Sequence, residues 1–292
     1  MLFHSLLEPR SNAYFELLSW RVRGPLHVAE FEDSWNVLIQ RHGVLRSLIA
    51  HEGADQPLQV VLEKRPIAVS HVDLRGTDVE RGVQQYRDTD RSLPFVLSTD
   101  LLLRVAVLRL ADEVYEVVWS HHHIVLDGWS VGLLLGELLD VYASQLAGVR
   151  PVDRAVPAFS SYVTWLGARD EAQAERYWAD TLRDCTRRIT IPHTRSGNVA
   201  AGAHREALRF ALDAQATASV TALAARCGVT LAVVLHAIWA VVLSRYCDQS
   251  DVVFGSVVSG RTADLPEVET MVGNLINTIP VRVQLDEAGT FA

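Results

Sequence analysis

The sequence predicts an α/β or α+β fold arranged in two lobes. Apolar runs with a period of two residues alternate along the chain with runs of helical period, the pattern of mixed folds. At 292 residues the chain is longer than one hydrophobic core usually fills. Hydrophobic residues make up 49% and charged residues 21%, which is typical of a folded globular protein. We therefore expect two units with a buried core in each.

The first elements are a strand, a helix and a second strand. The run AYFELLSWRVRG at 13–24 predicts a strand, and PLQVVLE at 57–63 predicts another. Between them, HVAEFEDSWNVLIQRHG at 27–43 has the apolar spacing of an amphipathic helix, which Gly43 is expected to end.

A β-hairpin and a helix follow. The β-rich runs at 101–110 and 114–123 are separated only by residues 111–113, which predicts a hairpin. After it, SVGLLLGELLDVYASQL at 130–146 predicts a helix, with Ser130 a candidate N-cap.

The second half begins after a break at 147–159, where prolines and charges interrupt the periodicity. We expect a linker there. Beyond it the pattern predicts, in order, two polar helices through 183, a strand at 206–213, a long helix at 229–246, a strand at 251–260, and a helix and a strand within 268–286.

The long apolar run at 229–246 is interrupted by Thr230 and His236 and ends in Arg245, so we interpret it as a buried core helix rather than a membrane span. A net charge of −8 and the lack of a basic stripe argue against nucleic-acid binding. The three cysteines form no CxxC pair, and the opening MLFHSLLEPR has no signal-peptide pattern; both indicate a reducing cytoplasm.

The run WSHHHIVLDGWS at 119–130 is the main candidate for chemistry. On a strand, His121 and His123 share one face and His122 takes the other, so the three rings cannot converge on one metal ion. Two interpretations remain open. The histidines pack in a core while Asp127 caps the next helix, or a histidine at the strand end handles protons beside the backbone N–H groups of a helix start.

Five stretches, in order, resemble the motifs of the condensation domains of nonribosomal peptide synthetases, in the chloramphenicol acetyltransferase-like superfamily. HHIVLDG at 122–128 resembles the HHxxxDG motif, RHGVLRS at 41–47 resembles RHxxLRT, and FSSYVTWL at 159–166 resembles YxDFAxW. The segment at 259–282 resembles SGR followed by MVGxFINTLPxR, and MLFHSLLEP at 1–9 resembles the end of the opening LSPMQEGMLFHSL.

The resemblance implies a two-lobed pseudo-dimer of α/β lobes around a central tunnel. The amino-terminal lobe would comprise residues 1–165, and residues 166–292 would form an incomplete carboxy-terminal lobe, because the last two family motifs are missing and the first begins midway. The chain by itself is therefore expected to be inactive. Ile49 and Glu267 replace the family's usual Phe and Gly with little consequence.

Carried over by position, the resemblance implies that His123 is the catalytic residue. The residues expected to support it structurally are His122, Asp127, Gly128 and Arg261, with Arg261 meeting Asp127 across the lobe boundary. The candidates for lining the substrate tunnel are Trp129, Ser130 and Asn277. For Trp129, Asn277, Arg41 and Arg46 a purely structural role stays open.

The implied activity is peptide-bond formation between two carrier-bound thioesters, with a D-configured donor. No cofactor or metal is expected on the chain itself, because phosphopantetheine would be held by upstream and downstream peptidyl carrier proteins next to an adenylation domain. Neither nucleic acid nor membrane is expected as a partner. The alternatives are an epimerisation domain, a free-standing acyltransferase, a non-catalytic recruitment domain of the same fold, or an inactive fragment. DGWSVG favours condensation over epimerisation, where DGVSWR is usual.

Overall fold

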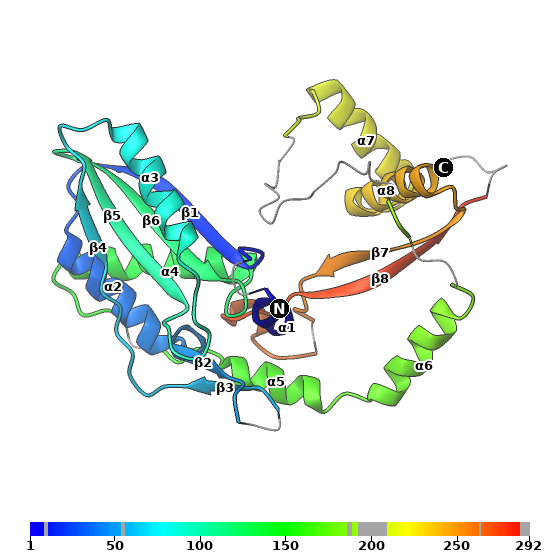
Figure 1. Cartoon of the computed structure of the whole chain (residues 1–292), viewed down its shortest axis with the longest axis horizontal. Coiled ribbons are helices and arrows are strands. Elements are labelled where there is room, and N and C mark those ends of the chain that lie inside the picture. Colours follow the sequence, from blue (N-terminus) through cyan, green and yellow to red (C-terminus); the bar gives the residue numbers. More distant parts are fainter. Residues whose placement is uncertain are drawn as a thin grey trace. The chain divides into compact units, whose positions relative to one another are not determined.

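The computed structural model describes residues 1–8, 11–53, 56–152, 154–185, 189–191, 209–262 and 264–286. The chain forms two compact units of mixed helices and strands (Figure 1), which confirms the expected fold class.

Unit 1 comprises Met1–Arg169 and Ser259–Ile276, and unit 2 comprises Asp170–Val258 and Asn277–Ala292. The segment Ser259–Ile276 therefore packs with the first unit, although the sequence placed it in the second lobe. The lobe boundary at 165/166 itself stays a prediction.

The main sheet of unit 1 contains the expected hairpin. Its described strands follow the order β1-β6-β5-β4. Strand β6 (Val114–His122) pairs antiparallel with β1 (Phe15–Arg23) on one side and with β5 (Leu103–Ala111) on the other. Strand β4 (Ser70–Asp73) adds parallel to β5. Because β6 is central, the end of this strand is held by neighbours on both sides.

Helices cover both faces of this sheet (Figure 1). Helices α2 (Val28–Arg41) and α4 (Gly128–Leu146) pack on each other and on one face, where alternate residues of β5 and β6 join their core. Trp35 of α2 meets Trp119 of β6 edge-on, with ring centroids 5.0 Å apart. Helix α3 (Val79–Ser92) covers the other face with a smaller cluster.

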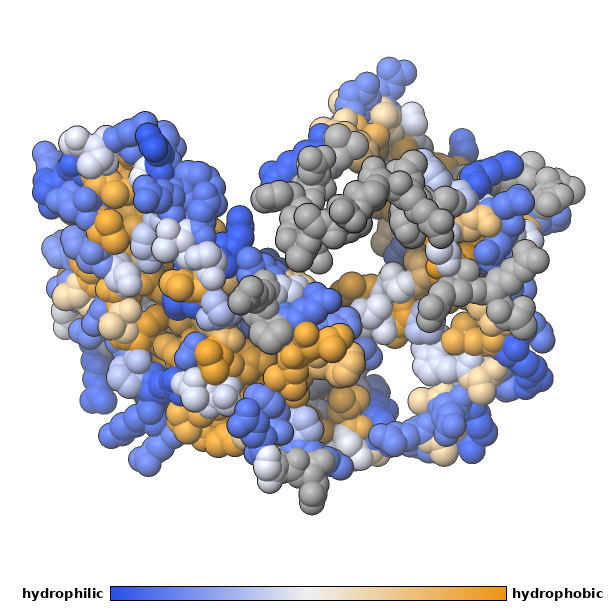
Figure 2. Space-filling model, viewed as in Figure 1, coloured by the Kyte–Doolittle hydropathy of each residue, from blue (hydrophilic) through white to orange (hydrophobic). Residues whose placement is uncertain are grey.

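Short elements complete unit 1. They are α1 Leu2–Leu7, the 3₁₀ helix η1 Gly43–Arg46, β2 Ser47–Ala50, β3 Leu58–Val61, α5 Phe159–Gly167 and the 3₁₀ helix η2 Val268–Thr270. Gly43 does not cap α2 as expected, because the cap is His42 in extended conformation and Gly43 already starts η1. The helix expected after 268 amounts to one short 3₁₀ turn. Hydrophobic side chains of α1 gather on the surface (Figure 2).

Unit 2 is helical with a two-stranded sheet in its described part. Helices α6 (Glu171–Leu182), α7 (Ala214–Cys227) and α8 (Leu231–Cys247) accompany β7 (Asp251–Val258), which pairs antiparallel with β8 (Asn277–Gln284). Of the strand expected at 206–213, residues 206–208 lie outside the described residues, and the rest is not a strand.

Helix α8 is not the buried core helix that its sequence predicts. Only Val234, Ala240 and Leu243 are buried, whereas other apolar residues such as Leu235 and Trp239 are exposed. Of the described elements, α7 and the two-stranded sheet pack against this helix, and they leave much of its apolar surface exposed. No single helix in the described ranges is long and apolar enough to span a membrane; α7 and α8 pass by length and composition only as a pair, bent by 101°.

Candidate active site

The candidate site is built on the turn that follows β6. The strand ends at His122, whose backbone N–H donates to the Leu102 carbonyl at 3.0 Å. One residue further, the His123 N–H donates to the carbonyl of Tyr14, just before β1, at 2.8 Å. The His122 carbonyl accepts from the Val125 N–H at 3.2 Å. Neighbours on both sides of β6 therefore fix the backbone that carries His123.

The three histidines lie in different surroundings. His121 and His122 are buried, and burial, together with the nearby His123, lowers the pKa of each to about 4. Both rings are therefore neutral at pH 7. His123 is half-buried, and its Nδ1 is buried without a hydrogen-bond partner in the described residues. His123 is thus the member of the run whose ring is partly accessible and whose Nδ1 is uncommitted.

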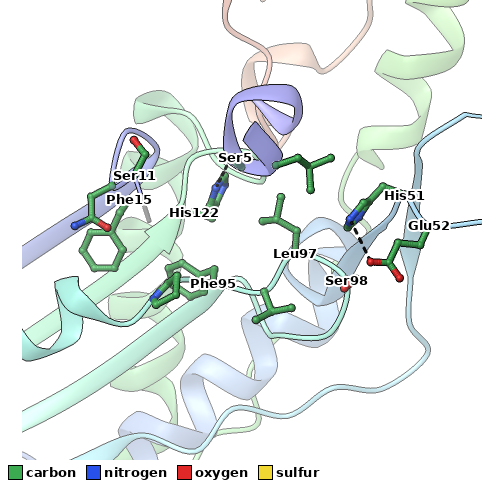
Figure 3. Close-up of a pocket in the computed structure, with 13 residues that line it drawn as sticks. Ser5, Ser11, Phe15, His51, Glu52, Phe95, Leu97, Ser98 and His122 are labelled. Atoms are coloured by element: carbon green, nitrogen blue, oxygen red, sulfur yellow. Dashed lines mark hydrogen bonds and ion pairs between the residues drawn. The ribbon is translucent and has the colours of Figure 1, made fainter. Parts of the chain in front are cut away.

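The His122 ring borders a pocket of about 260 Å³ in unit 1 (Figure 3). Phe15 and Phe95 stand on one side of the pocket, with ring centroids 5.9 Å apart. Ser5 of α1 also lines it, and its Oγ lies 3.3 Å from His122 Nε2. The described lining does not include His123, so this pocket belongs to the His122 side of the turn.

Asp127 caps helix α4 and is fully occupied by hydrogen bonds. Its Oδ1 accepts from the Ser130 N–H at 2.8 Å, and its Oδ2 accepts from the Leu275 N–H at 3.1 Å. Both oxygens also accept from Arg261 Nη2, at 3.1 and 3.2 Å. The two side chains are 0% and 2% exposed, so the ion pair expected from the resemblance is present and buried.

The pair differs from the expectation in the unit to which Arg261 belongs. One nitrogen of Arg261 serves both carboxylate oxygens, while its Nη1 donates to the carbonyls of Val268 and Met271 at 2.6 and 2.8 Å. Both partners belong to unit 1, so Arg261 does not reach Asp127 from the other unit. The cause is that the segment carrying Arg261 folds back onto the start of α4.

Ser130 is not the N-cap of α4, and its expected place in the lining of the substrate tunnel stays a prediction. Asp127 occupies the cap position, because Ser130 is already the third residue of α4. The hydroxyl of Ser130 donates to the Gly273 carbonyl at 2.7 Å and accepts from the Gly273 N–H and from Arg261 Nη2, both at 3.0 Å. With 0% exposure and its hydrogen-bonding capacity filled, it ties α4 to the Ser259–Ile276 segment.

The other candidates for substrate contact are exposed. Gly128 and Trp129 form the first turn of α4. The indole N–H of Trp129 donates to the Glu269 carbonyl at 2.8 Å, which holds its ring although 53% of the residue is exposed. Asn277 begins β8 in unit 2, and its side chain accepts from the Thr278 N–H. Substrate contact by Trp129 and Asn277 stays a prediction.

Arg41 and Arg46 have structural partners. Arg41 lies 2.9 Å from Glu137 of α4, which also binds His42 at 3.1 Å and Arg154 at 2.9 Å. Burial raises the pKa of Glu137, but the hydrogen bonds from His42 and Arg41 outweigh it and lower the pKa to about 2. Arg46 donates to the carbonyls of Leu62, Ile39 and Gln40.

Several residues of the site were not singled out from the sequence. Leu275 and Gly273 contribute backbone groups, which leave no trace in residue type. Ser5, Tyr14 and Glu137 stand far from the histidines in sequence and carry no local signal of their contacts. No group of three or more His, Cys, Asp or Glu side chains in the described ranges is arranged to hold a metal ion.

Known proteins match this chain over its whole length. The family described as Condensation domain matches residues 1–292. Bacitracin synthase 3 of Bacillus licheniformis is 37% identical over 292 residues, covering 100% of this chain and 5% of that protein. Surfactin synthase subunit 3 of Bacillus subtilis (strain 168) is 36% identical over 295 residues, covering 100% of this chain and 23% of that protein. The chain thus spans less than a quarter of the length of these relatives.

Solved structures share its fold. The X-domain from teicoplanin biosynthesis aligns with a TM-score of 0.82 at 23% identity, over 99% of this chain and 65% of that one. The first condensation domain of the CDA synthetase aligns with a TM-score of 0.76 at 22% identity, over 99% of this chain and 70% of that one. These likenesses confirm the fold that the sequence motifs imply. With the match of the family over all 292 residues, the chain belongs to the condensation domain family.

Proposed function

We propose that this chain, as part of a longer synthetase, catalyses amide formation in nonribosomal peptide synthesis, and that the 292 residues alone are inactive. The α-amine of an acceptor aminoacyl thioester attacks the carbonyl carbon of a donor thioester; the C–N bond forms, the C–S bond breaks, and the amine proton ends on the released thiol. Phosphopantetheine arms of upstream and downstream carrier proteins present the substrates, next to an adenylation domain. The chain itself needs no bound cofactor for this reaction.

The position of His123 carries the proposal. It lies in the HHIVLDG turn with a partly accessible ring, an uncommitted Nδ1 and a backbone held by Tyr14. His121 and His122 are neutral at pH 7, so they place no fixed positive charge against the one that develops on the attacking amine. An imidazole in such surroundings suits the uptake of that proton.

His123 need not be a strong base. A free α-amine has a pKa of about 7.7 to 8.0, so a useful fraction is unprotonated at neutral pH. His123 therefore takes the proton as the bond forms, positions the amine, or stabilises the tetrahedral intermediate. All three roles require the ring at the reacting atoms, and all three predict a large loss on its removal.

The test is His123→Ala in the full-length protein, with donor and acceptor loaded on their carriers. Condensation should fall by about a hundredfold or more, with an unchanged unfolding midpoint. His122→Ala should lower the unfolding midpoint, because this ring is buried, and should reduce condensation less than His123→Ala does. His71→Ala, an exposed histidine on β4, is the matched control and should change neither. Near-normal turnover by His123→Ala would show that His123 is not the catalytic residue.

We also infer that the donor ends in a D-configured residue. The support is the likeness of MLFHSLLEP and of the DGWS turn to the subgroup that follows epimerisation domains, together with Leu126, where the other subgroup often has Ser. Paired assays with D- and L-configured donors decide the point. Equal or faster turnover of the L-donor contradicts it.

The same substrates separate the alternatives. An epimerisation domain would exchange the α-hydrogen of a bound thioester with deuterated solvent and form no amide. A free-standing acyltransferase would use a diffusible amine as well as a carrier-bound one. A recruitment domain would do neither, and its His123→Ala variant would behave as the wild type.

A further inference from the structure

The short helix α1 contacts His122 directly through Ser5, and it is linked to His123 only through Tyr14, which His4 contacts. Ser5 Oγ lies 3.3 Å from His122 Nε2. His4 Nδ1 lies 2.8 Å from the hydroxyl of Tyr14, and the carbonyl of Tyr14 accepts the His123 N–H at 2.8 Å. The segment before β1 therefore reaches the ring of one histidine and the backbone of the next.

The contacts of His122 define the direction of its ring. The Ile124 N–H donates to His122 Nδ1 at 3.1 Å, so this nitrogen carries no hydrogen. Burial lowers the pKa of His122 to about 4, and the ring is neutral at pH 7. Its hydrogen is then on Nε2, which donates to Ser5 Oγ. The ring thus joins α1 to the turn that contains His123.

The packing of α1 indicates that these polar contacts matter more than burial. None of its six residues is buried, although Leu2 packs against the core. Phe3 and Leu7 are 70% and 65% exposed, so the helix gains little from removal of apolar surface. Figure 3 shows Ser5 directed toward His122 at the edge of the pocket.

We propose that Ser5 is a positioning residue: it fixes the His122 ring and, through the 122–125 turn, the direction of the His123 side chain. The inference rests on the proposed role of His123 in catalysis. Ser5 acts only through His122 and need not touch the substrate. The Ser5–His122 contact complements the Asp127–Arg261 pair, which holds the other end of the turn.

The kinetic test compares Ser5→Ala, Ser5→Thr and Ser11→Ala in the full-length protein with carrier-bound substrates. Loss of one hydrogen bond should lower kcat by roughly two- to tenfold with little change in KM. Ser5→Thr keeps the hydroxyl and should restore kcat. Ser11→Ala is the matched control, because the Ser11 hydroxyl bonds only to the Ala13 N–H in the described residues. Wild-type kcat in Ser5→Ala would overturn the proposal.

A double-mutant cycle separates positioning from a general loss of structure. In a His123→Ala background, Ser5→Ala should cause no further loss of kcat, because the side chain that it positions is gone. An undiminished effect in that background would mean that Ser5 does not act through His123, and would also overturn the proposal.

A readout without turnover tests the contact itself. Long-range ¹H–¹⁵N correlation spectra of the His122 ring should show the Nε2–H tautomer in the wild type. In Ser5→Ala, exchange of the Nε2 hydrogen with water should become faster. A wild-type ring in the Nδ1–H tautomer overturns the proposal whatever the activity, whereas an inactive wild type with the expected tautomer would overturn only the proposed function.

Discussion

Replacing Asp127 with alanine tests how the catalytic turn is held. The carboxylate accepts hydrogen bonds from the N–H groups of Ser130 and Leu275 and from Arg261 at both oxygens. With side-chain exposures of 0% and 2%, water neither screens the pair nor replaces a lost partner. The substitution therefore leaves Arg261 as a buried cation without its counter-charge.

The expected cost follows from two effects. Losing an N-cap side chain costs about 1 kcal/mol, and removing one partner of a buried ion pair costs about 3–5 kcal/mol. The two effects share one carboxylate and do not simply add. We therefore expect Asp127→Ala to lower the free energy of unfolding by about 3–5 kcal/mol. The free energy of unfolding of Asp127→Asn should lie between those of Asp127→Ala and the wild type, because an amide oxygen can still cap the helix but carries no charge.

Urea unfolding provides the measurement, with Asp78→Ala as the matched control. Asp78 is an exposed N-cap in the same unit, and its side chain accepts from the Arg81 N–H at 3.2 Å but forms no ion pair in the described residues. This control should lose about 1 kcal/mol. If Asp127→Ala lowers the free energy of unfolding no more than Asp78→Ala does, the buried Asp127–Arg261 pair does not stabilise the fold. If turnover collapses while the free energy of unfolding stays unchanged, Asp127 acts in catalysis rather than as a structural support.

Three further predictions concern pH and packing. The folded pKa of Glu137 is about 2, below its ordinary 4.5, so its contribution to the free energy of unfolding is present above pH 4.5 and lost toward pH 2. In urea unfolding, the free energies of the wild type and Glu137→Gln should differ by about 3 kcal/mol at pH 7 and converge in acid. His121 and His122 have folded pKa values of about 4, below the ordinary 6.5, so stability should fall as pH drops from 6.5 to 4, and His121→Gln should flatten that part of a thermal-unfolding profile. Gly273→Ala should lower the unfolding midpoint, because a Cβ there collides with the Phe159 ring, and an unchanged midpoint would show that the ring moves away freely.

The strongly periodic elements of the fold could be predicted from the sequence. The β5–β6 hairpin and helix α4 have clear apolar spacing and appear as expected. Helix α3 was missed because its sequence is mostly polar and only Val83 and Asp90 are buried. Helix α8 was predicted correctly from the sequence, but its burial was not. The apolar content of a helix does not reveal how much of its surface neighbouring elements cover.

The site could be predicted only where its partners are side chains in a recognisable motif. Asp127 and Ser130 are both common N-cap residues, so residue type left both open; the backbone places the N-cap at 127. Arg261 lies 134 residues away and was nominated by the resemblance alone. The N–H of Leu275, 148 residues from Asp127, could not be foreseen, because any residue but proline offers this donor.

The surroundings of His123 explain why its support comes from other residues. A hydrogen bond to one ring nitrogen of a histidine fixes the tautomer and helps to orient the ring. The Nδ1 of His123 has no such bond in the described residues, so its orientation depends on backbone contacts before and after it. Ser5 and His122 hold the end of β6, and Asp127 holds the start of α4. Weakening either the Ser5–His122 contact or the Asp127–Arg261 pair should therefore reduce the fraction of molecules in which the His123 ring has its reactive orientation, while the acid–base chemistry of the ring stays intact.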